Sequence, residues 1–74
     1  MEDFIKNFAE QFEDTDAAVF TPECKFRELE EWSSFMALAI MAMIKLEYDV
    51  AITANEMREA NTIQELYDLV QKHA

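Results

Sequence analysis

The residues best suited to chemistry are two adjacent serines, Ser33 and Ser34, which precede the most hydrophobic stretch of the chain. Ser33 is expected to cap a helix, because a serine hydroxyl readily accepts backbone N–H groups at a helix start. Ser34 would then lie in the first helical turn, where unpaired N–H groups and the helix dipole stabilise a negative charge such as a phosphate. The pattern therefore favours a serine that carries a modification.

Catalysis by the chain itself is disfavoured. A serine nucleophile needs a base and an orienting acid, and the only histidine, His73, is expected in a frayed terminal turn. A single cysteine, Cys24, and a single histidine do not form a recognisable zinc-ligand pattern. We therefore expect no enzyme activity, no catalytic residues and no metal site.

A first helix is expected around Phe4, Phe8 and Phe12, which recur every four residues and form one apolar stripe. The turn-forming segment 14–16 should end this helix. Periodicity then fades as far as residue 31, which indicates a long loop, unusual in so small a domain and often functional. Three apolar residues are spaced to pin this loop to the core: Phe20, Phe26 and Leu29.

A second helix is predicted from Ser34 to about Tyr48, with Asp49 as the left-handed residue that ends it. Residues 52–60 should form a short helix, and residues 62–65 read as the capping box of a last helix. The predicted fold is all-α: a small antiparallel four-helix bundle, with three main helices, one short helix and a long first loop. Residues 1–74 would form one domain.

Composition excludes several classes of function. The chain has 74 residues with 16 acidic against 6 basic side chains, a net charge of −10. This excess of carboxylates disfavours binding to nucleic acid or to anionic membranes. The almost uncharged stretch 32–46 is shorter than the about 20 residues that span a bilayer, so no membrane insertion is expected. The lone cysteine favours a reducing, cytoplasmic location, and we expect a monomer.

The order of these elements, together with the sequence around Ser34, resembles the acyl carrier protein family. The family motif Asp-Ser-Leu reads Ser33-Ser34-Phe35 here. Segment 26–32 looks like the loop that precedes the motif in one bacterial branch, and Glu47-Tyr48 matches the acidic and aromatic end of the family's second helix. The resemblance covers essentially the whole chain.

The resemblance implies that Ser34 carries a 4′-phosphopantetheine arm, attached covalently from coenzyme A through a phosphodiester. The arm would hold acyl groups as thioesters for fatty-acid, polyketide or related biosynthesis. Implied partners are a phosphopantetheinyl transferase and acyl-loading and acyl-processing enzymes. The chemistry would reside in the arm and in those partners, not in the carrier.

Departures from the family alter the expected docking surface. Ser33 replaces an aspartate that is expected to cap the helix and to help modifying enzymes bind. Partner contact should be more apolar than is usual in the family. The residues expected to provide it are Phe35, Leu38 and Ala42, with charge from Glu28, Glu30, Glu31 and Glu47.

Several readings stay open at this level. Met36, Met41 and Met43 could line an adaptable acyl pocket or simply fill the core. The glutamates before Trp32 are more typical of a solvated charged face than of a catalytic pair. The main alternative function is an acidic helical protein-binding module, or a degenerate carrier, that is not phosphopantetheinylated.

Overall fold

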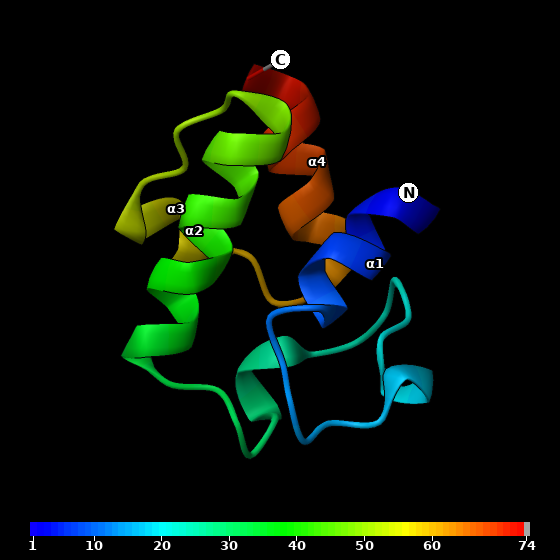
Figure 1. Ribbon diagram of the computed structural model, residues 1–74. Coiled ribbons are helices and arrows are strands. Elements are labelled where there is room, and N and C mark those ends of the chain that lie inside the picture. The colour runs from blue at the N-terminus through cyan, green and yellow to red at the C-terminus, as the bar shows by residue number, and fades with distance from the viewer. Residues whose placement is uncertain (74) are drawn as a thin grey trace.

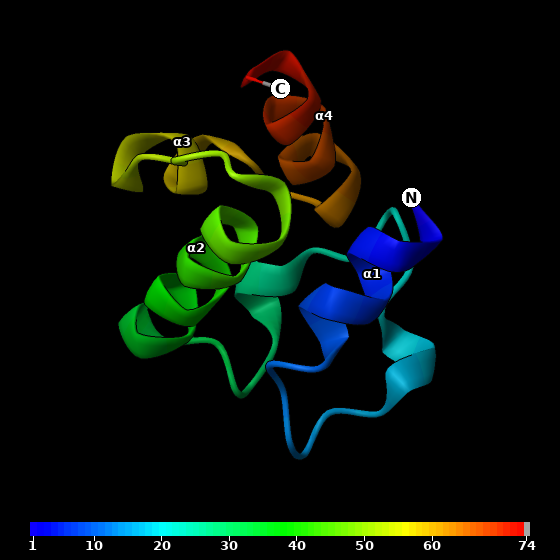
Figure 2. The same ribbon diagram turned by 45° about the horizontal axis from the view of Figure 1, so that its top comes forward.

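The computed structural model describes residues 1–73, and these form a small all-helical bundle, as the sequence predicts (Figure 1). The helices are α1 (Glu2–Ala9), α2 (Ser34–Tyr48), α3 (Ala54–Glu59) and α4 (Ile63–His73), with two short 3-10 turns, η1 (Ala17–Val19) and η2 (Phe26–Glu28), in the first loop. α1 runs opposite to α2, α4 crosses α1 at a steep angle, and short α3 lies beside α2 (Figures 1 and 2). Residues 1–73 contain no strand.

α1 is shorter than predicted, because it ends at Ala9 and does not continue to residue 14. After Ala9 the backbone tightens: the N–H of Gln11 donates to the carbonyl of Phe8, and the N–H of Phe12 donates to that of Ala9. These bonds span three residues where α-helical bonds span four. Phe12 is nevertheless buried, so the four-residue spacing marks a common buried side but not a continuous helix.

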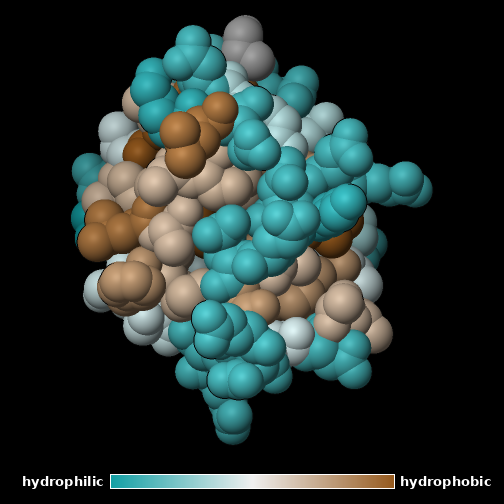
Figure 3. Space-filling model, in the orientation of Figure 1, coloured by the Kyte–Doolittle hydropathy of each residue, from teal (hydrophilic) through white to brown (hydrophobic). Residues whose placement is uncertain are grey.

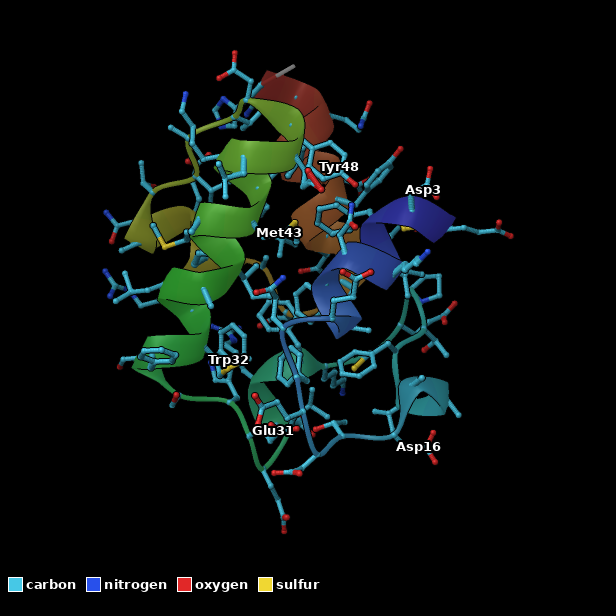
Figure 4. All side chains as sticks on the ribbon, in the orientation of Figure 1. Asp3, Asp16, Glu31, Trp32, Met43 and Tyr48 are labelled. Atoms are coloured by element: carbon cyan, nitrogen blue, oxygen red, sulfur yellow. The ribbon has the colours of Figure 1, made fainter. Side chains whose placement is uncertain are left out.

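The core is one cluster of apolar side chains drawn from every helix and from the long loop. Aromatic rings dominate the end beneath the loop, where Phe8 lies 5.4 Å from Phe26 and 5.5 Å from Phe12 between ring centroids. The largest fully buried side chains are Phe4, Phe8, Phe26, Ile40, Ile44, Ile63, Leu66 and Val70. Met43 and Tyr48 lie on the side of α2 that faces α1 and α4 (Figure 4).

The long loop is held in place by its own side chains and backbone. Phe20 and Phe26 are buried and Leu29 is partly buried, as predicted. Two loop carbonyls accept the first N–H groups of α4, at 3.2 Å from Cys24 to Ile63 and 2.9 Å from Pro22 to Gln64. Because helix starts carry unpaired donors, these bonds fix the loop and cap α4 together.

Both ends of α2 have the predicted residues. The Ser33 hydroxyl accepts the N–H of Met36 at 3.2 Å. Asp49 has φ 54° and ψ 39°, the left-handed conformation, and its N–H donates to the carbonyl of Lys45. Among residues 1–73, no helix has both the length and the apolar character needed to cross a membrane.

The capping boxes differ from the prediction. At α4 the Thr62 hydroxyl accepts the N–H of Glu65, but the Glu65 carboxylate accepts the N–H of Asn61. The reciprocal box lies at α3, where Thr53 caps Glu56 and the Glu56 carboxylate accepts the Thr53 N–H. α3 is therefore a properly started helix despite its length of 6 residues.

Candidate functional site

Ser34 is exposed as the first residue of α2. Its neighbour Ser33 performs the capping, since the Ser33 hydroxyl accepts from Met36 and the Ser33 carbonyl accepts from Ala37. Within the described part of the chain, the hydroxyl of Ser34 has no side-chain or backbone partner. The two adjacent serines thus have different surroundings, and Ser34 is the one with a free hydroxyl.

Ser34 also borders a groove of about 480 Å³, which lies between the first half of α2, the short helix α3 and the end of the long loop. This volume is within the range of small-molecule sites, roughly 300–1,000 Å³. The residues that line it are mostly apolar: Arg27, Trp32, Ser33, Ser34, Ala37, Leu38, Met41, Ala54, Met57 and Arg58. A group attached at Ser34 would start at the wall of this groove.

The loop end beside the groove is packed against aromatic side chains of the core. Trp32 is half-buried, with its ring centroid 4.9 Å from that of Phe26 and 6.4 Å from that of Phe12. Figure 4 shows Trp32 next to the N-terminal end of α2. The aromatic cluster therefore fixes the approach of the chain to Ser33 and Ser34.

The three methionines of α2 lie in two environments, the groove and the core. Met41 lines the groove, where Met57 of α3 joins it. Met36 and Met43 are buried in the core. A flexible thioether on each wall gives the groove an adaptable surface.

An exposed apolar stripe runs along the outer side of α2, which we define as Phe35, Leu38, Ala42 and Leu46. The exposed fractions of Phe35, Leu38 and Leu46 are 76%, 63% and 83%. Figure 3 shows brown and tan surface on the side that α2 occupies in Figure 1, bordered by hydrophilic residues. Such a surface is typical of an interaction site. The sequence prediction included the first three residues and missed Leu46.

The four glutamates expected at the docking surface have different environments. Glu28 and Glu30 are exposed near the end of the loop, and Glu47 is exposed near the opposite end of α2. Glu31 is half-buried and faces the segment that follows α1. Figure 4 shows it below Trp32, on the loop side.

The Glu31 carboxylate accepts three hydrogen bonds from residues 13–15. The donors are the Thr15 hydroxyl at 2.5 Å and the backbone N–H groups of Asp14 at 2.9 Å and Glu13 at 3.2 Å. The Thr15 hydroxyl, followed by the backbone donors, lowers the pKa of Glu31 from its ordinary value of 4.5. Glu31 therefore links the end of the long loop to its beginning at residues 13–15.

Other reactive side chains lie apart from Ser34. The His73 ring pairs with the Glu56 carboxylate at 2.5 Å and is not among the residues lining the groove. Burial raises the pKa of the Cys24 thiol, which disfavours its reactive thiolate form. In the described range, no three His, Cys, Asp or Glu residues are grouped to hold a metal ion.

Sequence reasoning missed Arg27, Met57 and Arg58 as groove residues. A usable signal was present for two of the three, because Arg27 and Arg58 are the only arginines of a strongly acidic chain. Compared with protein-family models, curated proteins and solved structures, the chain gives no significant match.

Proposed function

We propose that this protein is an acyl carrier, which presents acyl groups as thioesters on a 4′-phosphopantetheine arm attached to Ser34. The observation that carries the proposal is the position of Ser34 at the start of α2, where it is exposed, lines the mostly apolar groove and has no hydrogen-bond partner for its hydroxyl among residues 1–73. The resemblance of the chain to the acyl carrier family supports it. The partners would be a phosphopantetheinyl transferase and the acyl-loading and acyl-processing enzymes of fatty-acid, polyketide or related biosynthesis.

The physical setting of Ser34 suits a phosphodiester. Ser34 lies in the first turn of a 15-residue helix, so a negative phosphate there is favoured by the helix dipole. The groove offers an apolar shelter for the start of the arm or for its cargo. The exposed apolar stripe supplies a surface on which a partner enzyme could dock.

The test is incubation of the protein with coenzyme A and a promiscuous phosphopantetheinyl transferase, followed by intact mass measurement. We expect one phosphopantetheine to be added, Ser34→Ala to abolish the addition and Ser33→Ala to retain it. If several transferases leave the wild-type chain unmodified, the carrier proposal fails. If Ser33→Ala blocks the addition in a folded protein and Ser34→Ala does not, the attachment site is assigned to the wrong serine.

The exposed stripe on α2 specifically favours a second candidate, an acidic helical module that binds a protein partner without any modification. Such a module would bind its partner equally well when Ser34 is replaced by alanine. A carrier with Ser34 replaced by alanine could not be modified, and partner enzymes could no longer use it as a source of acyl thioesters. Measuring modification first, and partner binding of the unmodified chain second, separates the two functions.

A further inference from the structure

We propose that Arg27 and Arg58 make the groove beside Ser34 selective for an apolar chain that ends in a carboxylate. Both arginines of the molecule line this one groove. The groove contains no acidic side chain, although the chain carries 16 acidic residues. The charged side chains that line this groove are therefore all positive, in a protein whose net charge is −10.

The arginines lack the partners that usually neutralise them. Among residues 1–73, neither has a carboxylate oxygen within 4.0 Å of its guanidinium nitrogens. The Arg27 guanidinium donates to the backbone carbonyl of Arg58 and to the Asn61 side chain, and the Arg58 guanidinium donates to the Asn55 side chain. All of these acceptors are neutral, so neither guanidinium is held in a direct ion pair.

The same bonds position the pair. Because Arg27 donates to the Arg58 backbone, the loop and α3 are joined at the groove, and the two residues adjoin. A guanidinium has five N–H donors in a fixed plane, so donors remain free on both side chains. Carboxylates match this geometry and form charge-assisted hydrogen bonds with it.

The remaining walls set the other half of the specificity. Met41 and Met57 offer flexible apolar surface, and Ala37 and Ala54 leave space between the helices. An occupant must therefore combine an apolar body with an anionic end. Two sources have this chemistry: a free fatty carboxylate, or the distal carboxylate of an acyl group held on an arm at Ser34. The second source rests on the proposed function, whereas the first does not.

The free ligand is tested on the unmodified chain with decanoate, below its micelle-forming concentration, and with decanol as the neutral probe of equal length. Trp32 lines the groove and is the only tryptophan, so its fluorescence reports occupancy. At about 0.15 M salt the screening length is about 8 Å, so carboxylates farther than this from the two arginines affect the binding of an anion little. We expect saturable binding of decanoate, about fivefold tighter than decanol, because its carboxylate can form charge-assisted hydrogen bonds with the half-buried Arg27 and the exposed Arg58.

Arg58→Gln should weaken decanoate binding about fivefold and leave decanol binding unchanged, and Arg58→Lys should retain part of the preference. Lys6→Gln is the matched control, since it removes one positive charge from α1, outside the groove. Arg27→Gln also removes two structural bonds, so its melting temperature is measured beside its affinity. Equal binding of decanoate and decanol, or equal loss in Lys6→Gln and Arg58→Gln, would overturn the proposal.

A second arm identifies the source. Ser34 is loaded enzymatically from glutaryl- and pentanoyl-coenzyme A, and Trp32 fluorescence is compared between the two forms. A change specific to the glutaryl form, lost in Arg58→Gln, assigns the site to arm-bound cargo. No difference between loaded forms, with decanoate still bound by the unmodified chain, assigns it to a free carboxylate. Failure of loading counts against the proposed function only, because the decanoate arm then decides the groove's selectivity alone.

Discussion

Replacing Ser33 and Ser34 one at a time separates capping from modification. Ser33→Ala removes the hydroxyl that accepts the Met36 N–H at 3.2 Å, and Ser34→Ala removes a hydroxyl without a partner. Loss of a serine cap costs about 1 kcal/mol, within a range of about 0.5–2 kcal/mol. A domain of this size has a total stability of roughly 4–11 kcal/mol, so this single bond represents roughly a tenth to a quarter of it.

The magnitude is measurable by thermal unfolding followed by circular dichroism. For a chain of this length, about 1 kcal/mol corresponds to a fall in melting temperature of about 4–8 °C. Ser34→Ala should change stability by less than about 0.5 kcal/mol, because alanine is the better helix former and no bond is lost. Ser33→Asp is the control that keeps a capping acceptor, and its melting temperature should be no lower than that of the wild type.

The opposite pattern of melting temperatures would contradict the assignment of Ser33 as the cap. A wild-type melting temperature for Ser33→Ala, or a fall of several degrees for Ser34→Ala alone, would show that the cap is formed by the other serine. The modification assay should give the reverse ranking, with Ser34→Ala inactive and Ser33→Ala modified. Ser33→Asp restores the aspartate of the resembled family, and we expect faster modification than in the wild type.

Three further predictions concern the elements that hold the site. Asp49→Gly should be at least as stable as wild type in urea unfolding, because glycine relieves the left-handed strain and this gain exceeds the about 0.3–0.5 kcal/mol of the lost Lys45 contact. Asp49→Ala should be about 1 kcal/mol less stable than wild type, because alanine tolerates the left-handed conformation less well than aspartate and also loses that contact. An Asp49→Ala variant more stable than wild type would contradict this reasoning. Glu31 has a lowered pKa, so its contribution to stability is present above its ordinary value of 4.5 and is lost as pH falls through the folded value. Glu31→Gln should therefore be less stable than wild type at neutral pH, with the difference shrinking in acid unfolding curves; a difference independent of pH would refute the role of the charge. Phe26→Ala should lower the free energy of unfolding by about 3–5 kcal/mol, because the Phe26 ring is fully buried against Phe8 and Trp32. Hydrogen exchange of the loop amides should become faster in this variant. A smaller loss of stability would show that other residues hold the loop.

The sequence predicted the elements whose signals are local. Ser33 and Asp49 mark the two ends of α2 because a cap and a left-handed residue each depend on a few neighbouring atoms. The end of α1 was wrong by several residues because Phe12 keeps the buried spacing after the backbone has tightened. Periodicity reports which side is buried, and it does not distinguish a helix from a turn that continues the same face.

The sequence predicted the exposed position of Ser34 at the start of α2, but it did not predict the groove beside it. The groove joins α2 with α3 and with the loop, so its other wall depends on contacts between residues distant in sequence. Arg27 and Arg58 are 31 positions apart and meet through a backbone carbonyl, which leaves no periodic signal. The role of Glu31 was hidden for the same reason, since its acceptors face residues 13–15 across the loop.

The placement of Glu31 also changes what the acidic charge can contribute to docking. Glu31 is occupied by the loop, so Glu28 and Glu30 at one end of α2 and Glu47 near the other remain exposed. Between these ends the exposed surface of α2 is mainly apolar, with Lys45 as its exposed charged residue. Exposed charges are screened over about 8 Å at physiological salt, whereas burial of apolar surface contributes about 25 cal/mol per Å² and salt at this level does not screen it. A partner that covers this stripe should therefore lose affinity on Leu38→Ser at any salt concentration, while Glu30→Gln should matter only when salt is low.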